Sequence, residues 1–393
     1  MVGFQLSDIQ RERQARARAF IESTLTPAVA AIDQQDEFPW DIVEQGVRFG
    51  LTTMLIPAAY GGGDYDNLSA GLVLEELGAA CAGLATVFGA SILGTGPIVL
   101  LGNEAQKQRW LSRIAADASG RFLCAFAVTE AAAGSAAASG HPQFGIQLRG
   151  QRNGDDYLLS GSKCFISNGS VARLFTVLAR THPTKASLGG LSFFVVDPAQ
   201  GVRIGRVERK IGQRACPAAE LLFEDTRVPA DDLLGREGAG SIGLTQTISF
   251  STPLVAAVCV GVARQATHLA LMHARHSKPS LLEDQGVAMR LFDMATTVEA
   301  ARNLAWRALC ENDRRRDPAT GRLMGAPNLK LAAMAKVFAS DACVRLVDDA
   351  LQIVGPEALT GNHPLSKLAR DAKLMQIFEG TNQIHRIATA RLL

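Results

Sequence analysis

The sequence has little net charge, few aromatic residues and no paired-cysteine motif. Its 393 residues include 40 lysines and arginines against 38 aspartates and glutamates, so the formal net charge is only +2. No block of like charge is present, which argues against a nucleic-acid partner or an anionic membrane surface. With 47% hydrophobic residues, the chain is long and apolar enough for two or three domains with large cores.

Seven cysteines are scattered along the chain, and none lies in a CxxC pair. An odd number at such spacings disfavours both a disulfide framework and a zinc site. We therefore expect reduced and mostly buried thiols, no metal, and a cytoplasmic location. The first residues quickly become polar and charged, so they do not predict a signal peptide.

Two uncharged runs, 77–103 and 241–263, are long enough to cross a bilayer. The first is interrupted by several glycines and Pro97, and the second by serines, threonines and Pro253. Neither run is flanked by a basic cluster. We expect buried helices of a bundle and no membrane span.

Helical patterns fill the first 119 residues. Ser7 followed by Gln10 forms a capping box, and a second helix begins near Trp40 and ends at Gly50. From 120 to 236 the chain changes to short apolar runs separated by turn signals such as Asn153-Gly154, and from 237 to 393 it is helical again. This order predicts an α+β fold with domains at 1–119, 120–236 and 237–393. No βαβ alternation supports a Rossmann sheet.

The most informative stretch is 378–386, Phe-Glu-Gly-Thr-Asn-Gln-Ile-His-Arg. Thr381 is a good N-cap for a following helix, and Gly380 allows a sharp turn before it. Glu379 is therefore expected on a tight connection between two helices. A carboxylate there is either a solvated loop residue or a base whose pKa burial has raised. The local pattern alone favours the solvated residue.

Two further motifs fall in the β region. One is Phe126-Ala-Val-Thr-Glu-Ala-Ala-Ala-Gly-Ser135, which by itself reads as a strand end followed by a loop of small residues. The other, at 161–169, is Gly-Ser-Lys-Cys-Phe-Ile-Ser-Asn-Gly, which by itself reads as a strand ending in an Asn-Gly turn.

Together, the three stretches resemble the signatures of the acyl-CoA dehydrogenases, and the resemblance extends over the whole helix–strand–helix order. It implies an N-terminal helical domain, a middle antiparallel β domain and a C-terminal four-helix bundle. Members of this family bind FAD between the β domain and the bundle. They are usually homotetramers, so a homotetramer or homodimer is implied here.

The resemblance also implies roles for individual residues. Glu379 would be the base that takes the α-proton of an acyl thioester, while hydride passes to flavin N5 and the trans-2-enoyl thioester forms. The residues implied in FAD binding are Phe126, Val128, Thr129, Gly134, Ser135, Phe165, Ile166, Ser167, Arg275, Gln285, Gln352, Gly355, Thr381 and Gln383. Of these, Arg275, Gln285, Gln352 and Gly355 match positions that reach the FAD of a neighbouring subunit. The residues implied in substrate binding are Ser135, Gly380 and Arg391.

The sequence departs from the family pattern in places. Cys216-Pro217-Ala218 stands where polar residues near the thioester arm are common, and Pro356 replaces a glycine. These changes leave open whether the acyl carrier is CoA or an acyl carrier protein. Ala85 and Gly89 replace larger residues of medium-chain relatives, which suggests a roomier apolar pocket. Ser251 lies in the region where some relatives carry an alternative Glu base, and no Glu is present there.

The expected function is thus FAD-dependent α,β-dehydrogenation of an acyl thioester in fatty acid metabolism. The electron acceptor would be an electron-transfer flavoprotein or oxygen. Two alternatives remain open at this point: a flavin monooxygenase or oxidase built on the same fold, and a non-catalytic acyl-binding paralogue. The monooxygenases and oxidases of this fold generally lack the Glu of Phe-Glu-Gly-Thr, so Glu379 argues against them.

Overall fold

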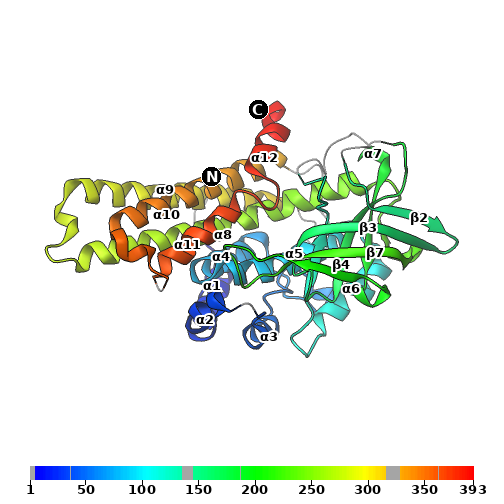
Figure 1. Cartoon of the computed structure of the whole chain (residues 1–393), viewed down its shortest axis with the longest axis horizontal. Coiled ribbons are helices and arrows are strands. Elements are labelled where there is room, and N and C mark those ends of the chain that lie inside the picture. The colour runs from blue at the N-terminus through cyan, green and yellow to red at the C-terminus, as the bar shows by residue number, and fades with distance from the viewer. Residues whose placement is uncertain (1–4, 36, 135–144, 186, 316–327, 362) are drawn as a thin grey trace.

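The computed structural model describes residues 5–35, 37–134, 145–185, 187–315, 328–361 and 363–393. Along the chain, a group of helices is followed by a sheet and then by a long helical bundle, as expected for an α+β fold. Figure 1 shows the long helices of the bundle extending away from the sheet. Helix α5 packs against both the sheet and the bundle, so it joins the two halves of the molecule.

The N-terminal helices are α1 (Asp8–Phe20), α2 (Val29–Gln34), α3 (Trp40–Phe49), α4 (Asn67–Ala80), α5 (Ala82–Leu101) and α6 (Glu104–Ala115). The capping box at Ser7 is confirmed: Ser7 accepts from the N–H of Gln10, and the Gln10 side chain accepts from the N–H of Ser7. Helix α3 ends where predicted, because Gly50 adopts a left-handed conformation with φ of 99°.

The strands are β1 (Cys124–Ala127), β2 (Arg149–Asn153), β3 (Asp156–Ser167), β4 (Leu174–Arg180), β5 (Leu191–Val196), β6 (Arg203–Val207), β7 (Ala218–Pro229) and β8 (Leu233–Leu234). They form one sheet in the order β6-β7-β3-β2-β4-β5-β8, with β1 beside β4. A short helix, α7 (Ser187–Gly190), precedes β5. The hairpin predicted at Asn153-Gly154 joins β2 to β3.

Most neighbouring strands are antiparallel, as predicted. Strand β2 pairs with β4 in parallel at one residue pair, Arg149 with Arg180, and β1 runs parallel to β4 along its whole length. The sequence pattern did not predict this pair. A parallel pair needs a long crossover, and here the chain between β1 and β4 supplies it by first building the β2–β3 hairpin. The start of β1 lies on the middle of α5, where the N–H of Cys124 donates to the Ser91 hydroxyl at 3.0 Å.

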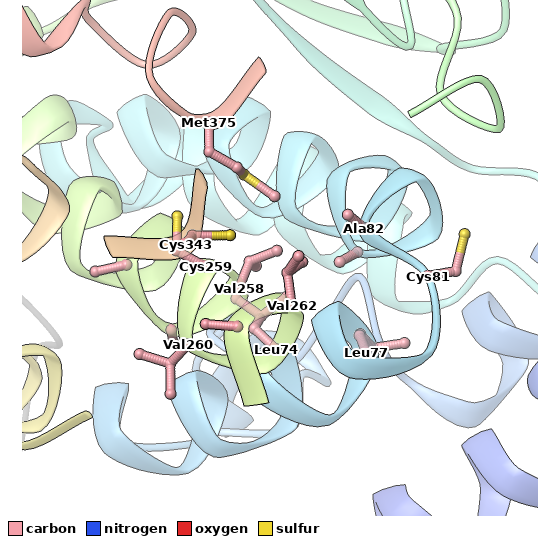
Figure 2. Packing of buried hydrophobic residues seen from close by; sticks show 14 of the residues in the cluster. Leu74, Leu77, Cys81, Ala82, Val258, Cys259, Val260, Val262, Cys343 and Met375 are labelled. Atoms are coloured by element: carbon pink, nitrogen blue, oxygen red, sulfur yellow. The ribbon is translucent and has the colours of Figure 1, made fainter. Parts of the chain in front are cut away.

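The bundle consists of α8 (Gly240–His276), α9 (Gln285–Arg314), α10 (Leu329–Val354) and α11 (Pro364–Met375), and α12 (Asn382–Thr389) follows. Helix α8 packs closely on α4, because glycines bring the two backbones together. A Cβ on Gly261 would lie 2.1 Å from the carbonyl oxygen of Glu75, and one on Gly78 would lie 2.5 Å from that of Val258. Figure 2 shows the buried cluster at this crossing, into which Met375 of α11 also points.

A junction centred on Gln213 joins the β domain to α5 and α11. Its buried side chain accepts a hydrogen bond from the Thr86 hydroxyl at 2.8 Å and donates one to the backbone carbonyl of Asp371 at 3.1 Å. The N–H of Gln213 donates to the carboxylate of the same Asp371. Gly212 is required beside it, because a Cβ there would lie 2.2 Å from the carbonyl oxygen of Arg370.

Within the described part of the chain, α5 and α8 are long and apolar enough to cross a membrane by length and composition. Their most apolar windows are 67% and 61% buried inside the fold. The two helices pack against each other and against α4. We interpret them as core helices, as the sequence predicted.

Candidate active site

A cavity of about 850 Å³ lies where the sheet, α5 and the bundle meet. Helices α5 and α8 form much of its wall, together with the ends of β1 and β3 and the turn between α11 and α12. The lining is mostly apolar, with a small number of hydroxyl and charged groups. A concave apolar site with few polar groups is typical of a small-molecule or cofactor pocket.

This cavity brings together the three motifs singled out in the sequence. The predicted site residues that line it are Phe126, Val128, Thr129, Gly134, Phe165, Ile166, Ser167, Glu379, Gly380 and Thr381. Ser135 lies outside the described residues. Segments separated by more than two hundred residues thus face one another across a single space.

A buried ion pair anchors the loop that follows β1. Lys163 Nζ donates to a carboxylate oxygen of Glu130 at 2.8 Å and to the carbonyl of Val128 at 3.0 Å. Glu130 also accepts the backbone N–H groups of Gln147 and Leu148, at 2.7 and 3.0 Å. Burial lowers the pKa of Lys163 to about 8, and the charge of Glu130 acts in the opposite direction. Because buried charges require partners, this pair fixes the loop that lines the cavity.

Phe165 presents an unusually exposed aromatic ring to the cavity, 58% accessible near the end of β3. Its backbone is left-handed, with φ of 56°, and so is that of the buried Asn168, with φ of 61°. The side chain of Asn168 donates to the carbonyl of Val87 on α5 at 2.8 Å, which anchors the end of β3. A left-handed conformation at a bulky residue persists only where the surroundings enforce it.

Glu379 lies in the turn between α11 and α12, not on either helix. Both Glu379 and Gly380 are left-handed, with φ of 56° and 85°. Ser251 of α8 donates its hydroxyl to the Glu379 carboxylate. Burial raises the pKa of Glu379 to about 7, while the Ser251 hydrogen bond and the charge of Lys336 oppose that rise. A carboxyl group that exchanges its proton near neutral pH suits general acid–base chemistry.

Two side chains from neighbouring helices support this turn. The ring Nε2 of His385 on α12 lies 2.9 Å from the carbonyl oxygen of Glu379. Lys336 Nζ on α10 donates to the carbonyl of Gly380 and to the side-chain oxygen of Asn382, each at 2.8 Å. The N-cap predicted at Thr381 is confirmed, since its hydroxyl accepts from the N–H of the third helical residue at 3.2 Å.

The sequence pattern did not assign a role to Ser251, Lys336 or His385. His385 lies within the 378–386 stretch, and Ser251 stood out only as the place of a missing Glu. Lys336 gave no signal, because a lysine in an amphipathic helix is ordinarily a solvated residue. In the structure, however, Lys336 is 0% exposed.

The remaining predicted residues do not line the cavity. Arg275 lies in the last turn of α8 and Gln285 begins α9, at the end of the bundle that points away from the sheet (Figure 1). Gln352 and Gly355 lie at the C-terminal end of α10. Their contacts with a neighbouring subunit's FAD therefore stay a prediction. So do the roles of Gln383 and Arg391, both exposed on and after α12.

Comparison with known proteins identifies the family. Residues 7–118, 125–226 and 238–393 match the models of the acyl-CoA dehydrogenase N-terminal, middle and C-terminal domains. A probable acyl-CoA dehydrogenase, fadE25, of Mycobacterium leprae is 33% identical over 99% of this chain and 96% of its own. A cyclohex-1-ene-1-carbonyl-CoA dehydrogenase of Syntrophus aciditrophicus is 35% identical over 99% and 91%.

Solved structures agree with this assignment. Butyryl-CoA dehydrogenase from Megasphaera elsdenii is 33% identical, with a TM-score of 0.91 and coverage of 100% of this chain and 99% of that one. The prolyl acyl carrier protein oxidase AnaB is 26% identical, with a TM-score of 0.89 and coverage of 99% of both chains. An FAD complex of an acyl-CoA dehydrogenase from Bacillus anthracis is 26% identical, with a TM-score of 0.89 and coverage of 100% of this chain and 69% of that one.

The chain belongs to the acyl-CoA dehydrogenase family. It is a flavoprotein oxidoreductase of that type, and its cofactor is FAD, as the sequence predicted. The cavity residues fit such a group. Phe165 and Ile166 would offer apolar surface to a planar ring, and Thr129 and Ser167 would supply hydroxyl groups to it. Among the described residues, no atom lies within 4 Å of a Cβ placed on Gly134, so the described part of the loop leaves room for a ligand to approach there.

Proposed function

We propose that the protein catalyses α,β-dehydrogenation of an acyl thioester, with Glu379 as the base. The carboxylate of Glu379 removes a proton from the α carbon, and the β carbon loses a hydride, so that a trans double bond forms between them. Bound FAD supplies the acceptor for that hydride. The residues of this chain bind the acyl group, exclude water and hold the proton at Glu379.

An α-proton is far less acidic than a carboxylic acid, so the thioester carbonyl must be polarised as the proton leaves. We assign this role to the backbone N–H of Glu379, in line with the family resemblance. A water-poor site strengthens such a hydrogen bond and raises the basicity of the carboxylate. The proton affinity of Glu379, with a pKa of about 7, is suited to this step.

The observation that carries this proposal is the placement of Glu379. Its carboxyl group, with a pKa raised to about 7, shares one cavity with Phe165 and Thr129 of the middle domain. A base and a flavin-binding wall in one apolar cavity are what removal of a proton and a hydride from adjacent carbons requires. A solvated loop carboxylate, the alternative on local grounds, would neither line a cavity nor hold such a pKa.

The acyl group is proposed to lie between α5 and α8, where the wall is apolar. In the part of the chain that the structure describes, a Cβ added at Gly89 would meet no atom within 4 Å, so this position leaves room in the cavity. Related enzymes are described as acting on butyryl-CoA and cyclohex-1-ene-1-carbonyl-CoA. We therefore propose a short or cyclic acyl-CoA as the first substrates to examine.

One structural feature favours an acyl carrier protein, instead of CoA, as the carrier of the acyl group. Cys216 is buried and Pro217 gives its carbonyl to the N–H of Asn168, so this segment does not supply the polar side chains expected near a pantetheine arm. The similar structure AnaB is described as a prolyl acyl carrier protein oxidase. An acyl group held by an acyl carrier protein is therefore the alternative substrate.

The remaining proposals rest on the family resemblance. The electron acceptor is proposed to be an electron-transfer flavoprotein, with oxygen as the alternative. A homotetramer or homodimer and a cytoplasmic location complete the proposal.

The decisive experiment is an anaerobic titration of the FAD-loaded protein with acyl-CoA and acyl carrier protein thioesters, followed by flavin absorbance. We expect one class of thioester to bleach the flavin, and Glu379→Gln to bind FAD normally but to abolish bleaching. Because substitution of a general base removes a rate factor of roughly 10²–10⁴ or more, the difference will be unambiguous. Bleaching that persists at the wild-type rate in Glu379→Gln would refute the assignment of the base.

A further inference from the structure

The turn that carries Glu379 has two consecutive left-handed residues, and each has its carbonyl bonded to a buried side chain. His385 Nε2 faces the Glu379 carbonyl at 2.9 Å, and Lys336 Nζ faces the Gly380 carbonyl at 2.8 Å. The two donors come from different helices, α12 and α10. A left-handed glutamate is unfavourable for an L-residue, so this conformation needs external support.

His385 is suited to hold the turn as a neutral donor. The group opposite its Nε2 is a carbonyl, which only accepts, so the ring proton resides on Nε2. Burial lowers the pKa of His385 below its ordinary value, which keeps the ring uncharged at neutral pH. A Cβ at Gly380 would lie 2.8 Å from the same Nε2, so the ring packs directly against that glycine.

Lys336 is held just as firmly. Its Nζ also donates to the side-chain oxygen of Asn382, whose amide nitrogen donates in turn to Ser340 at 2.8 Å and to Asp341 at 2.7 Å. Burial lowers the pKa of Lys336 to about 8, so the amine is still mostly protonated at neutral pH. A buried ammonium close to Glu379 favours the carboxylate over the carboxylic acid.

We propose that Lys336 and His385 are positioning residues that clamp the Glu379–Gly380 turn and hold the carboxylate in the cavity. The proposal rests on the function assigned above to Glu379. The two residues act differently, because His385 fixes the direction of the Glu379 peptide group, whereas Lys336 fixes the next peptide and adds a positive charge. The other titratable groups that line the cavity are Glu130, Lys210 and Lys373, and Ser251 is the hydroxyl partner of the carboxylate.

This difference gives each residue its own kinetic consequence. Loss of the Lys336 charge should raise the pKa of Glu379, because the ammonium favours the ionised form. Loss of the His385 hydrogen bond should not move the titration midpoint of Glu379, because the His385 ring is neutral. It should lower the maximal rate, because the Glu379 carboxylate is then misplaced. A displacement of about 1 Å in a catalytic group can cost roughly a hundredfold in rate.

The test uses the FAD-loaded full chain and the variants Lys336→Met, His385→Leu and His385→Gln. The rate of flavin reduction by the active thioester is measured against pH. In parallel, difference infrared spectroscopy of the carboxylic acid band, with Glu379→Gln as the blank, reports the Glu379 titration without turnover. The exposed Lys278→Met, after α8, and the exposed His268→Leu, on α8, are matched controls at positions that do not line the cavity.

We expect Lys336→Met to move the midpoint of both profiles upward by roughly one pH unit. We expect His385→Leu to lower the maximal rate roughly ten- to a hundredfold with an unmoved midpoint. His385→Gln should recover most of the rate, because the glutamine amide can donate near the position of Nε2. Should Lys336→Met fail to fold, Lys336→Gln, which keeps a neutral donor, is expected to show the same upward shift.

The clamp proposal would be refuted if the pH midpoint were unshifted in both lysine variants. It would also be refuted if His385→Leu and His385→Gln lost the same fraction of the maximal rate. The infrared arm separates this outcome from a failure of the proposed function. If no thioester reduces the flavin, the dehydrogenase proposal falls. The Glu379 titration in the lysine variants still decides whether Lys336 acts on the turn.

Discussion

Ser251 on α8 donates its hydroxyl to the carboxylate of Glu379, although 128 residues separate the two in the chain. The same hydroxyl lies 3.0 Å from the carbonyl of Thr247 in the preceding helical turn. A serine has one proton to donate, so it can serve the carboxylate or the carbonyl at one time. When Glu379 is protonated, its own O–H can donate to Ser251 while Ser251 donates to Thr247. Both protonation states of the base are therefore accommodated.

Substitution of Ser251 should move the working pH range of the enzyme. The Ser251 hydrogen bond lowers the pKa of Glu379 against the effect of burial. A hydrogen bond to a charged group contributes roughly 1.5–3 kcal/mol, so Ser251→Ala should shift the pH midpoint of flavin reduction upward by about one pH unit or more. Ser251→Thr, which retains the hydroxyl, is the control. A profile for Ser251→Ala identical to that of the wild type would contradict the assignment.

Removal of the base should stabilise the protein at alkaline pH. The pKa of Glu379 is raised from 4.5 to about 7 in the folded state, so between these values the folded protein binds more protons than the unfolded chain. Stability therefore falls as pH rises through this window. Glu379→Gln should raise the melting temperature at pH 8 but not at pH 4.5, with a gain of at most about 3 kcal/mol.

Differential scanning calorimetry at the two pH values tests this expectation. Glu12→Gln on the exposed side of α1 serves as the control, because it removes a carboxylate that is not buried. A wild-type melting temperature that is equal to or above that of Glu379→Gln at pH 8 would show that the carboxylate carries no stability cost.

The buried pair Lys163–Glu130 should be needed for both stability and cofactor retention. Lys163→Met leaves Glu130 buried without its cation, which typically costs about 3–5 kcal/mol. The loop beside Val128 loses its anchor at the same time, so FAD content should fall. Melting temperature and the ratio of flavin to protein absorbance measure the two effects. Lys163→Met combined with Glu130→Gln should recover much of the lost stability; if the double variant melts no higher than the single one, the pair is not the cause.

Gly89 should set the size of the acyl group. Among the described residues no atom lies within 4 Å of a Cβ placed there, so Gly89→Ala adds a methyl group without a clash, and Gly89→Leu should fill the cavity further. We expect kcat/KM for longer thioesters to fall progressively while that for the shortest one is retained. Helix stability should rise slightly, because glycine is a poor helix former. Equal loss for all chain lengths would place the acyl group elsewhere.

Much of the fold could be predicted from the sequence because its signals are local. The capping box at Ser7, the left-handed glycine after α3 and the Asn153-Gly154 hairpin each depend on a few adjacent residues. The sequence pattern does not indicate strands β6 and β8. Strand β6 is largely exposed and so lacks an apolar run, and β8 has only two residues. The parallel β1–β4 pair was missed because strand pairing depends on the whole topology and not on local pattern.

The residues of the candidate site also fall into those with a local sequence signal and those without one. Thr129, Phe165 and Glu379 belong to contiguous motifs and could be singled out before their meeting in one cavity was known. Ser251 and Lys336 lie on long helices, and only the packing of α8 and α10 around the α11–α12 turn brings them to Glu379. Their role depends on contacts between segments far apart in the chain, for which a single sequence gives no spacing rule.

The Gln213 junction has a thermodynamic consequence for the cofactor. The cavity wall is divided between the β domain on one side and α8, α11 and α12 on the other, and Gln213 joins these parts through Asp371 and Thr86. Any ligand that touches both sides binds only when the halves are docked, so its binding free energy is added to the free energy of docking. Conversely, a change at the junction weakens cofactor affinity by the same amount that it favours separation of the halves. Retention of FAD during purification is therefore a sensitive measure of how tightly the two halves of this chain hold together.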